Sequence, residues 1–102
     1  MLRLVFGMLL LASPAHAISP EWTAQKCALY INAWDMMTDG GTLEGLSEPF
    51  KKGNSAFMAT GCTTRGTVCP VSDAERAVAD ALSLMMVGEG ATGSFLPFHC
   101  DG

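Results

Sequence analysis

Hydrophobic positions recur at helical spacing in three stretches of the chain. The first stretch runs from Pro20 to Thr38, with Ser19 as a predicted N-cap and Asp39-Gly40-Gly41 as its end. Its apolar positions share one side of a helix: Trp22, Leu29, Tyr30, Ala33, Trp34 and Met37. This pattern predicts an amphipathic helix.

Two further helices follow. The second is predicted from Ser47 to Thr60, where Phe50 and Phe57 are seven residues apart and share a face. The third begins at a capping box, in which Ser72 is followed three residues later by Glu75, and ends near Gly88. Its predicted buried stripe is Ala74, Val78, Ala81, Leu82 and Met85.

The C-terminal segment, residues 91–102, is too apolar to be a free tail, since it contains Phe95-Leu96-Pro97-Phe98. We expect it to pack across the helices. The predicted fold is therefore all-α, a small three-helix bundle with a packed C-terminal tail, and we expect its helices to run up, down and up.

The N-terminus has the three parts of a secretory signal peptide. Arg3 precedes an apolar stretch at residues 4–12, and Ala15-His16-Ala17 forms an A-x-A cleavage site. The apolar stretch is shorter than the roughly 20 residues that span a bilayer. We expect cleavage of residues 1–17, a single helical domain at residues 18–102 without a membrane span, and a periplasmic or secreted location.

Composition narrows the function classes. The chain has 10 acidic and 6 basic side chains, a net charge of −4, and only 16% charged residues. An acidic chain is a poor partner for nucleic acid. Another protein is the expected partner, and no cofactor is expected.

The four cysteines predict two disulfides, because exported chains of this size are commonly cross-linked. The pairing Cys27–Cys62 with Cys69–Cys100 is favoured, since it ties every element together. The alternative is Cys62–Cys69 with Cys27–Cys100. A zinc site or a redox-active motif would require closer C-x-x-C spacing, so no metal site is expected.

Two methionine pairs, Met36-Met37 and Met85-Met86, would meet at one end of an up-down-up bundle. Thioether clusters can bind Cu(I), although methionine more often fills gaps in a core. His99 adjoins Cys100, which is no nucleophile once oxidised. We therefore expect no enzyme activity and no catalytic residues.

The loop between Cys62 and Cys69 contains Thr63, Thr64, Arg65, Gly66 and Thr67. A short loop anchored by a disulfide loses little entropy on binding, so these five residues are candidate binding residues. The alternative is that they are a plain connector.

Three short motifs carry a resemblance to a known family: residues 27–31 (CALYI), 69–72 (CPVS) and 96–100 (LPFHC). In these motifs the chain resembles the small exported Tai-type immunity proteins, which act against type VI secretion amidases. The resemblance implies a protein that binds and blocks a toxin enzyme outside the cytoplasm. The alternatives are a periplasmic acid-stress chaperone, which exposes apolar surface when its carboxylates protonate, and a Met-based copper carrier.

Overall fold

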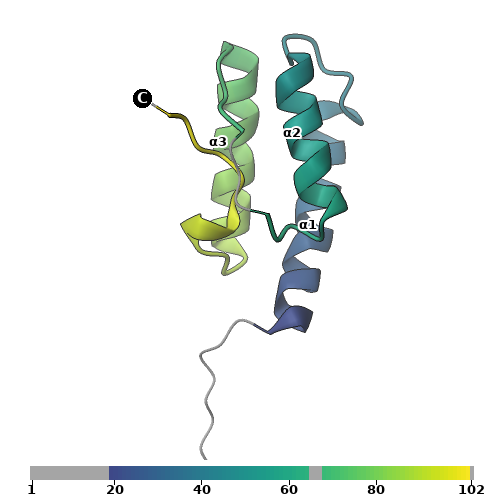
Figure 1. The fold of residues 1–102 in the computed structure, drawn as a ribbon. Coiled ribbons are helices and arrows are strands. Elements are labelled where there is room, and N and C mark those ends of the chain that lie inside the picture. Colours follow the sequence, from purple (N-terminus) through teal and green to yellow (C-terminus); the bar gives the residue numbers. More distant parts are fainter. Residues whose placement is uncertain (1–18, 65–67, 102) are drawn as a thin grey trace, which may run out of the picture.

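The fold is known from a computed structural model, which describes residues 19–64 and 68–101. It contains α1 (Pro20–Thr38), α2 (Glu48–Ala59), α3 (Asp73–Gly88) and the short 3₁₀ helix η1 (Gly93–Phe95) (Figure 1). The described residues form no β-sheet, so the all-α class is confirmed. The predicted signal peptide, residues 1–17, lies outside the described residues.

All three α-helices begin at a serine cap. The hydroxyl groups of Ser19, Ser47 and Ser72 each accept a hydrogen bond from a backbone N–H in the first helical turn. These bonds satisfy N–H groups that have no partner within the helix, which explains why each helix starts there. The predicted capping box of α3 is confirmed.

The direction of α3 differs from the expected up-down-up arrangement. The Ser72 hydroxyl donates to the Gly45 carbonyl at 2.7 Å, which places the start of α3 beside the loop between α1 and α2. At the other end of α3, Phe95 packs against Trp22 at the start of α1. Helix α3 therefore runs antiparallel to α1 and parallel to α2. The extended stretch before α3 returns the chain along the bundle and permits this direction (Figure 1).

The core forms where α1 packs against α2 and α3. Tyr30 makes edge-to-face contact with Phe57, and Trp34 packs against Phe50, so α1 and α2 are antiparallel. The Tyr30 hydroxyl donates to Asn54 Oδ1, and Asn54 Nδ2 donates to the Phe50 carbonyl at 2.9 Å. This buried pair satisfies two polar side chains that would otherwise destabilise the core.

The buried face of α3 is rotated from the predicted stripe. Its buried residues are Glu75, Val78, Ala79, Leu82 and Met86. Met85, predicted to be buried, is 37% exposed, whereas Met86 is fully buried. The rotation follows from the burial of Glu75, which bonds to the start of α2.

The C-terminal tail packs on the bundle, as predicted. The Val68 N–H donates to the Pro97 carbonyl and the His99 N–H donates to the Val68 carbonyl, both at 3.0 Å. Phe95 makes edge-to-face contacts with Tyr30 and Phe57. The tail is thus held by backbone bonds as well as by aromatic packing.

Both disulfides have the favoured pairing. Cys27 bonds to Cys62 and joins α1 to the end of α2. Cys69 bonds to Cys100 and joins the extended segment before α3 to the C-terminal tail. Each cross-link of this kind typically adds about 2–4 kcal/mol to the free energy of unfolding.

Gly53 allows α2 and the extended segment at residues 68–71 to approach closely. A Cβ atom at Gly53 would lie 2.6 Å from Val68 Cγ2, closer than van der Waals contact allows. Glycine in a helix interior costs roughly 1 kcal/mol relative to alanine. The close contact with Val68 explains why glycine stands here.

We predict that Gly53→Ala destabilises the protein. The clash with Val68 costs about 1–3 kcal/mol, which exceeds the gain of about 1 kcal/mol in helix propensity. The midpoint of urea unfolding should fall. In a Val68→Ala background the same substitution should raise the midpoint, because the clash is gone. Stabilisation of equal size in both backgrounds would contradict this account.

Candidate functional site

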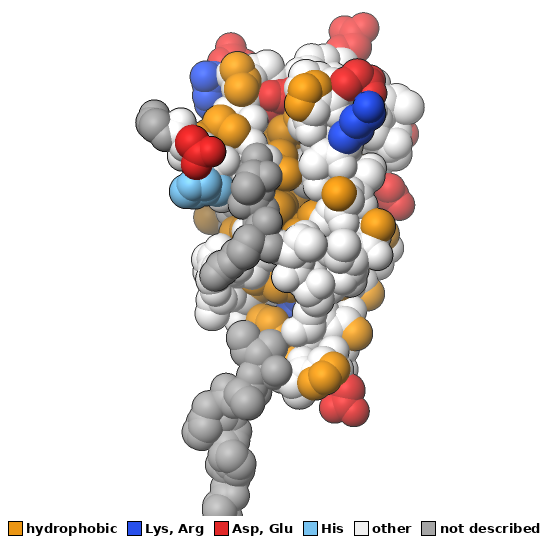
Figure 2. Space-filling view, in the orientation of Figure 1, with side chains coloured by type: hydrophobic (Ala, Val, Ile, Leu, Met, Phe, Trp, Pro, Cys, Tyr) orange, Lys and Arg blue, Asp and Glu red, His pale blue; other side chains and the backbone are white. Residues whose placement is uncertain are grey.

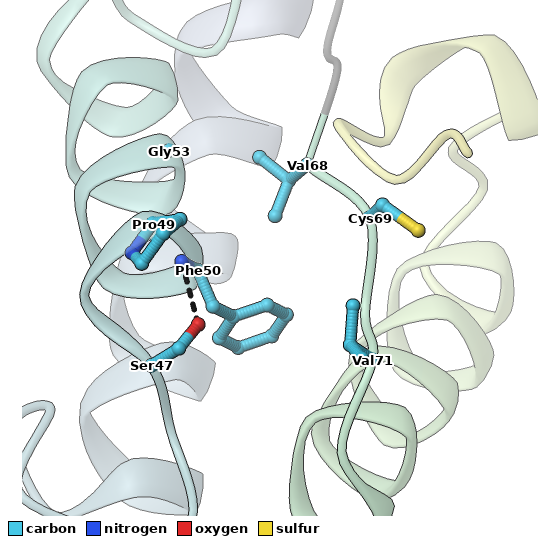
Figure 3. A pocket seen from close by; sticks show the side chains of 7 residues that line it. All are labelled: Ser47, Pro49, Phe50, Gly53, Val68, Cys69 and Val71. Carbon is cyan, nitrogen blue, oxygen red and sulfur yellow. Dashed lines mark hydrogen bonds between the residues drawn. The ribbon is translucent and has the colours of Figure 1, made fainter. Parts of the chain in front are cut away.

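A groove lies between α2 and the extended segment before α3. It has a volume of about 350 Å³. Hydrophobic side chains are visible along the hollow between α2 and α3 in Figure 2. Figure 3 shows the Val68 side chain directed toward α2, the Phe50 ring beside it, and the Cys69 sulfur directed away. The lining residues are Ser47, Pro49, Phe50, Gly53, Val68, Cys69 and Val71.

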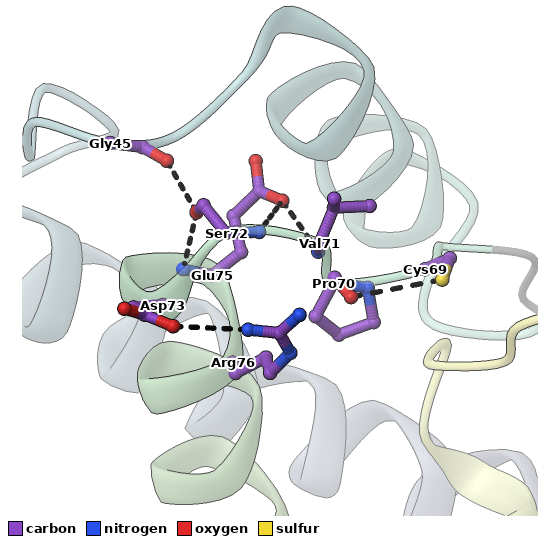
Figure 4. A network of polar contacts seen from close by, with 8 residues as sticks. All are labelled: Gly45, Cys69, Pro70, Val71, Ser72, Asp73, Glu75 and Arg76. Atoms are coloured by element: carbon purple, nitrogen blue, oxygen red, sulfur yellow. Dashed lines mark hydrogen bonds and ion pairs between the residues drawn. The ribbon is translucent and has the colours of Figure 1, made fainter.

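The Glu75 carboxylate fixes one end of this groove (Figure 4). Its Oε1 accepts from the N–H groups of Val71 and Ser72 at 2.8 and 3.2 Å. Its Oε2 accepts from the Ser47 N–H at 2.7 Å. One side chain, 1% exposed, therefore connects the starts of α2 and α3.

These contacts control the ionisation of Glu75. Burial alone would raise the pKa of this carboxyl, but the hydrogen bonds from Ser47, Val71 and Ser72 outweigh burial and lower the pKa to about 2. The pKa in the folded state is thus below that of the unfolded chain. The stabilisation is fully present above about pH 4.5 and is lost as the pH falls toward 2.

Helix α3 carries apolar side chains on its solvent-exposed side as well as on its buried side. Leu84 is 77% exposed and Val87 is 55% exposed, one helical turn apart. We call the surface formed by Ala77, Ala81, Leu84, Met85 and Val87 the outer face of α3. Other exposed large hydrophobic residues, such as Met36 and Val71, lie outside α3, but three lie together on this face, and such a grouping is typical of a site that another molecule covers.

The charges beside this face are mainly acidic. Asp80 is exposed on the same side of the helix, and Glu89 follows at its end. Arg76 is paired with Asp73 at 3.1 Å, so its charge is already balanced. The electrostatic complement of this surface is a partner that carries Lys or Arg around an apolar centre.

The predicted binding loop is described only in part. The Thr63 hydroxyl donates to the Thr60 carbonyl at 2.8 Å, and the Thr64 and Thr60 hydroxyls are 3.3 Å apart. Thr63 also borders two surface hollows, of about 230 and 470 Å³, beside the start of α1. Arg65, Gly66 and Thr67 lie outside the described residues, so the binding role of the loop stays a prediction.

The methionine pairs do not meet. Met36 and Met37 end α1 beside the start of α3, whereas Met85 and Met86 lie near the far end of α3. The meeting of the two pairs required α3 to run parallel to α1, so that alternative is wrong, and Met86 fills the core instead. Across residues 19–64 and 68–101, no group of three or more His, Cys, Asp or Glu side chains is arranged to hold a metal.

His99 is exposed on the tail. Its Nε2 lies 3.2 Å from Asp101 Oδ1, and the adjoining Cys100 is in a disulfide. Asp35, Asp39 and Asp80 are exposed. In the part of the chain that the structure describes, no helix has the length and apolar character needed to cross a membrane.

Comparison with known proteins found no match: no family model, no curated protein and no solved structure is similar to this chain.

We predict that Glu75→Gln lowers the free energy of unfolding at pH 7 by about 1–3 kcal/mol, because buried N–H groups lose a charged acceptor. The difference from wild type should shrink as the pH falls from 4.5 toward 2, where wild-type Glu75 also becomes neutral. Urea unfolding at pH 7 and at pH 2.5 measures both effects.

Asp80→Asn is the matched control, since Asp80 is an exposed acid on the same helix. It should leave the unfolding midpoint nearly unchanged at either pH. Equal stability of wild type and Glu75→Gln at pH 7 would show that the carboxylate does not hold the two helix starts together.

Proposed function

We propose that this protein is a small exported protein-binding module that docks through the outer face of α3. The observation that carries the proposal is the exposure of Leu84 and Val87 on a helix that is already buried on its other side. A second apolar face serves no purpose in the core of the bundle. It gains stability only when another molecule covers it.

The partner that fits is another protein with an apolar helical surface and Lys or Arg at its edge. Asp80 and Glu89 border the outer face and would attract those cations. The bundle supports docking because the Glu75 bonds hold the start of α3 against the start of α2 before binding. A rigid surface loses little conformational entropy on association.

Inhibition of a toxin enzyme is the most specific form of this proposal. It rests on the resemblance of residues 27–31, 69–72 and 96–100 to Tai-type immunity proteins. The two disulfides fit an oxidising, exported setting. An acid-stress chaperone is the alternative, since the stabilisation from the Glu75 carboxylate is lost as the pH falls from about 4.5 toward 2, which would favour opening in acid.

We predict that the double variant Leu84→Ser/Val87→Ser loses a complex that the wild type forms. Native mass spectrometry of unreduced protein recovered from its exporting cell measures the complex. Loss of two central apolar contacts should weaken binding by at least about tenfold, which corresponds to about 1.4 kcal/mol.

Met36→Ser is the matched control, because Met36 is 75% exposed but lies on α1. Retention of the complex in this variant, with loss in the double variant, supports the outer face of α3 as the site. A species of twice the chain mass would mean that the surface binds a second copy instead. A wild type recovered without any partner would overturn the proposal.

A further inference from the structure

The two disulfides differ in their exposure to solvent. Cys27 and Cys62 are only 5% and 4% exposed. In the other bond Cys69 is half-buried and Cys100 is exposed. Thiol–disulfide exchange requires an attacking thiolate to reach a sulfur atom directly, so exposure decides which bond reacts in the folded protein.

The exposed bond anchors a segment that covers the core. We call residues 95–100 the strap. Its Phe98 ring stacks on Phe50 with centroids 6.2 Å apart, and its Phe95 ring contacts Phe57 at 5.8 Å. Pro97 is almost fully buried. Apart from the disulfide, the strap is fixed to the extended segment by the two backbone bonds of Val68.

We propose that Cys69–Cys100 is a thiol-exchange site, at which an external dithiol reduces the bond and releases the strap while the helices stay assembled. The inference is independent of the proposed docking through α3. Its substrate class is a dithiol, either a small molecule or a protein with a reactive cysteine pair.

Reduction of the Cys69–Cys100 disulfide by a dithiol proceeds in two exchange steps. A thiolate of the dithiol attacks the exposed Cys100 Sγ, the S–S bond breaks, and Cys69 leaves as a thiolate that takes up a proton. The second thiol of the reagent then attacks the mixed disulfide, and Cys100 leaves as a thiolate that is also protonated. The dithiol is oxidised to a disulfide, and the protein gains two electrons and two protons.

The helices have contacts that do not involve the strap. The buried Cys27–Cys62 bond joins α1 to the end of α2. Glu75 joins the starts of α2 and α3, and Tyr30 bonds to Asn54 across α1 and α2. Reduction of the exposed bond leaves all of these in place. Release of the strap would then uncover Phe50 and Phe57 on an otherwise intact bundle.

The first test is selective reduction with dithiothreitol under native conditions. Samples are quenched with iodoacetamide, and the labelled cysteines are identified by peptide mass. Cys69 and Cys100 should be labelled about tenfold faster than Cys27 and Cys62. Equal rates, or faster labelling of the buried pair, would overturn the proposal.

The second test follows the strap on protein in which only Cys69 and Cys100 are reduced and alkylated. Far-ultraviolet circular dichroism should remain helical, while binding of an apolar dye and protease cleavage within residues 95–100 should increase. Unchanged dye binding would show that the strap stays bound, and loss of helix would show that it is not a separate unit. Either result would overturn the proposal that reduction releases the strap from an intact bundle.

The variant Cys69→Ser/Cys100→Ser should reproduce this state without alkylation. Its matched control is Cys27→Ser/Cys62→Ser, which removes the buried bond and should lower the stability of the whole bundle without selectively freeing the strap. If the control frees the strap to the same extent, the assignment to Cys69–Cys100 is wrong.

Discussion

The arrangement of this protein depends on the carboxylate of Glu75. A charged group removed from water is stable only when hydrogen bonds replace the lost hydration, and here three backbone N–H groups do so. Because those donors belong to the starts of α2 and α3, the two helices must begin side by side. The direction of α3, and the extended segment that returns the chain to that end, follow from this requirement.

That extended segment in turn organises the rest of the surface. Val68 packs into the space above Gly53 on one side and forms the backbone bridge to the tail on the other. The same segment lines the groove of Figure 3 and carries Cys69. One connection between helices thus joins the groove, the tail and a disulfide, while α3 is left with an apolar face toward solvent.

Local signals in the sequence predicted the local structure well. Capping signals act within a few residues, and they located the starts of the first and third helices, while the spacing of Phe50 and Phe57 located the second. The direction of α3 was not predictable, since helical periodicity carries no information on which end of a neighbour a helix meets. The sequence placed Glu75 in a capping box. Its hydrogen bond to the Ser47 N–H could not be predicted, because the two residues are 28 positions apart and no local sequence pattern connects them.

The same limit explains the errors at single residues. Met86 is buried in the core and Met85 is exposed, because the face of α3 that buries Glu75 differs from the face with the most apolar residues. Leu84 and Val87 lie outside the predicted stripe, and both are exposed.

The order of the disulfides has a consequence for how the chain matures. Cys27 pairs with Cys62 and Cys69 pairs with Cys100, so the first cysteine bonds to the second and the third to the fourth, and the two loops do not overlap along the chain. In a chain that emerges N-terminus first, the first bond can close before the third cysteine appears. A bond that closes in order of emergence is therefore also a native bond.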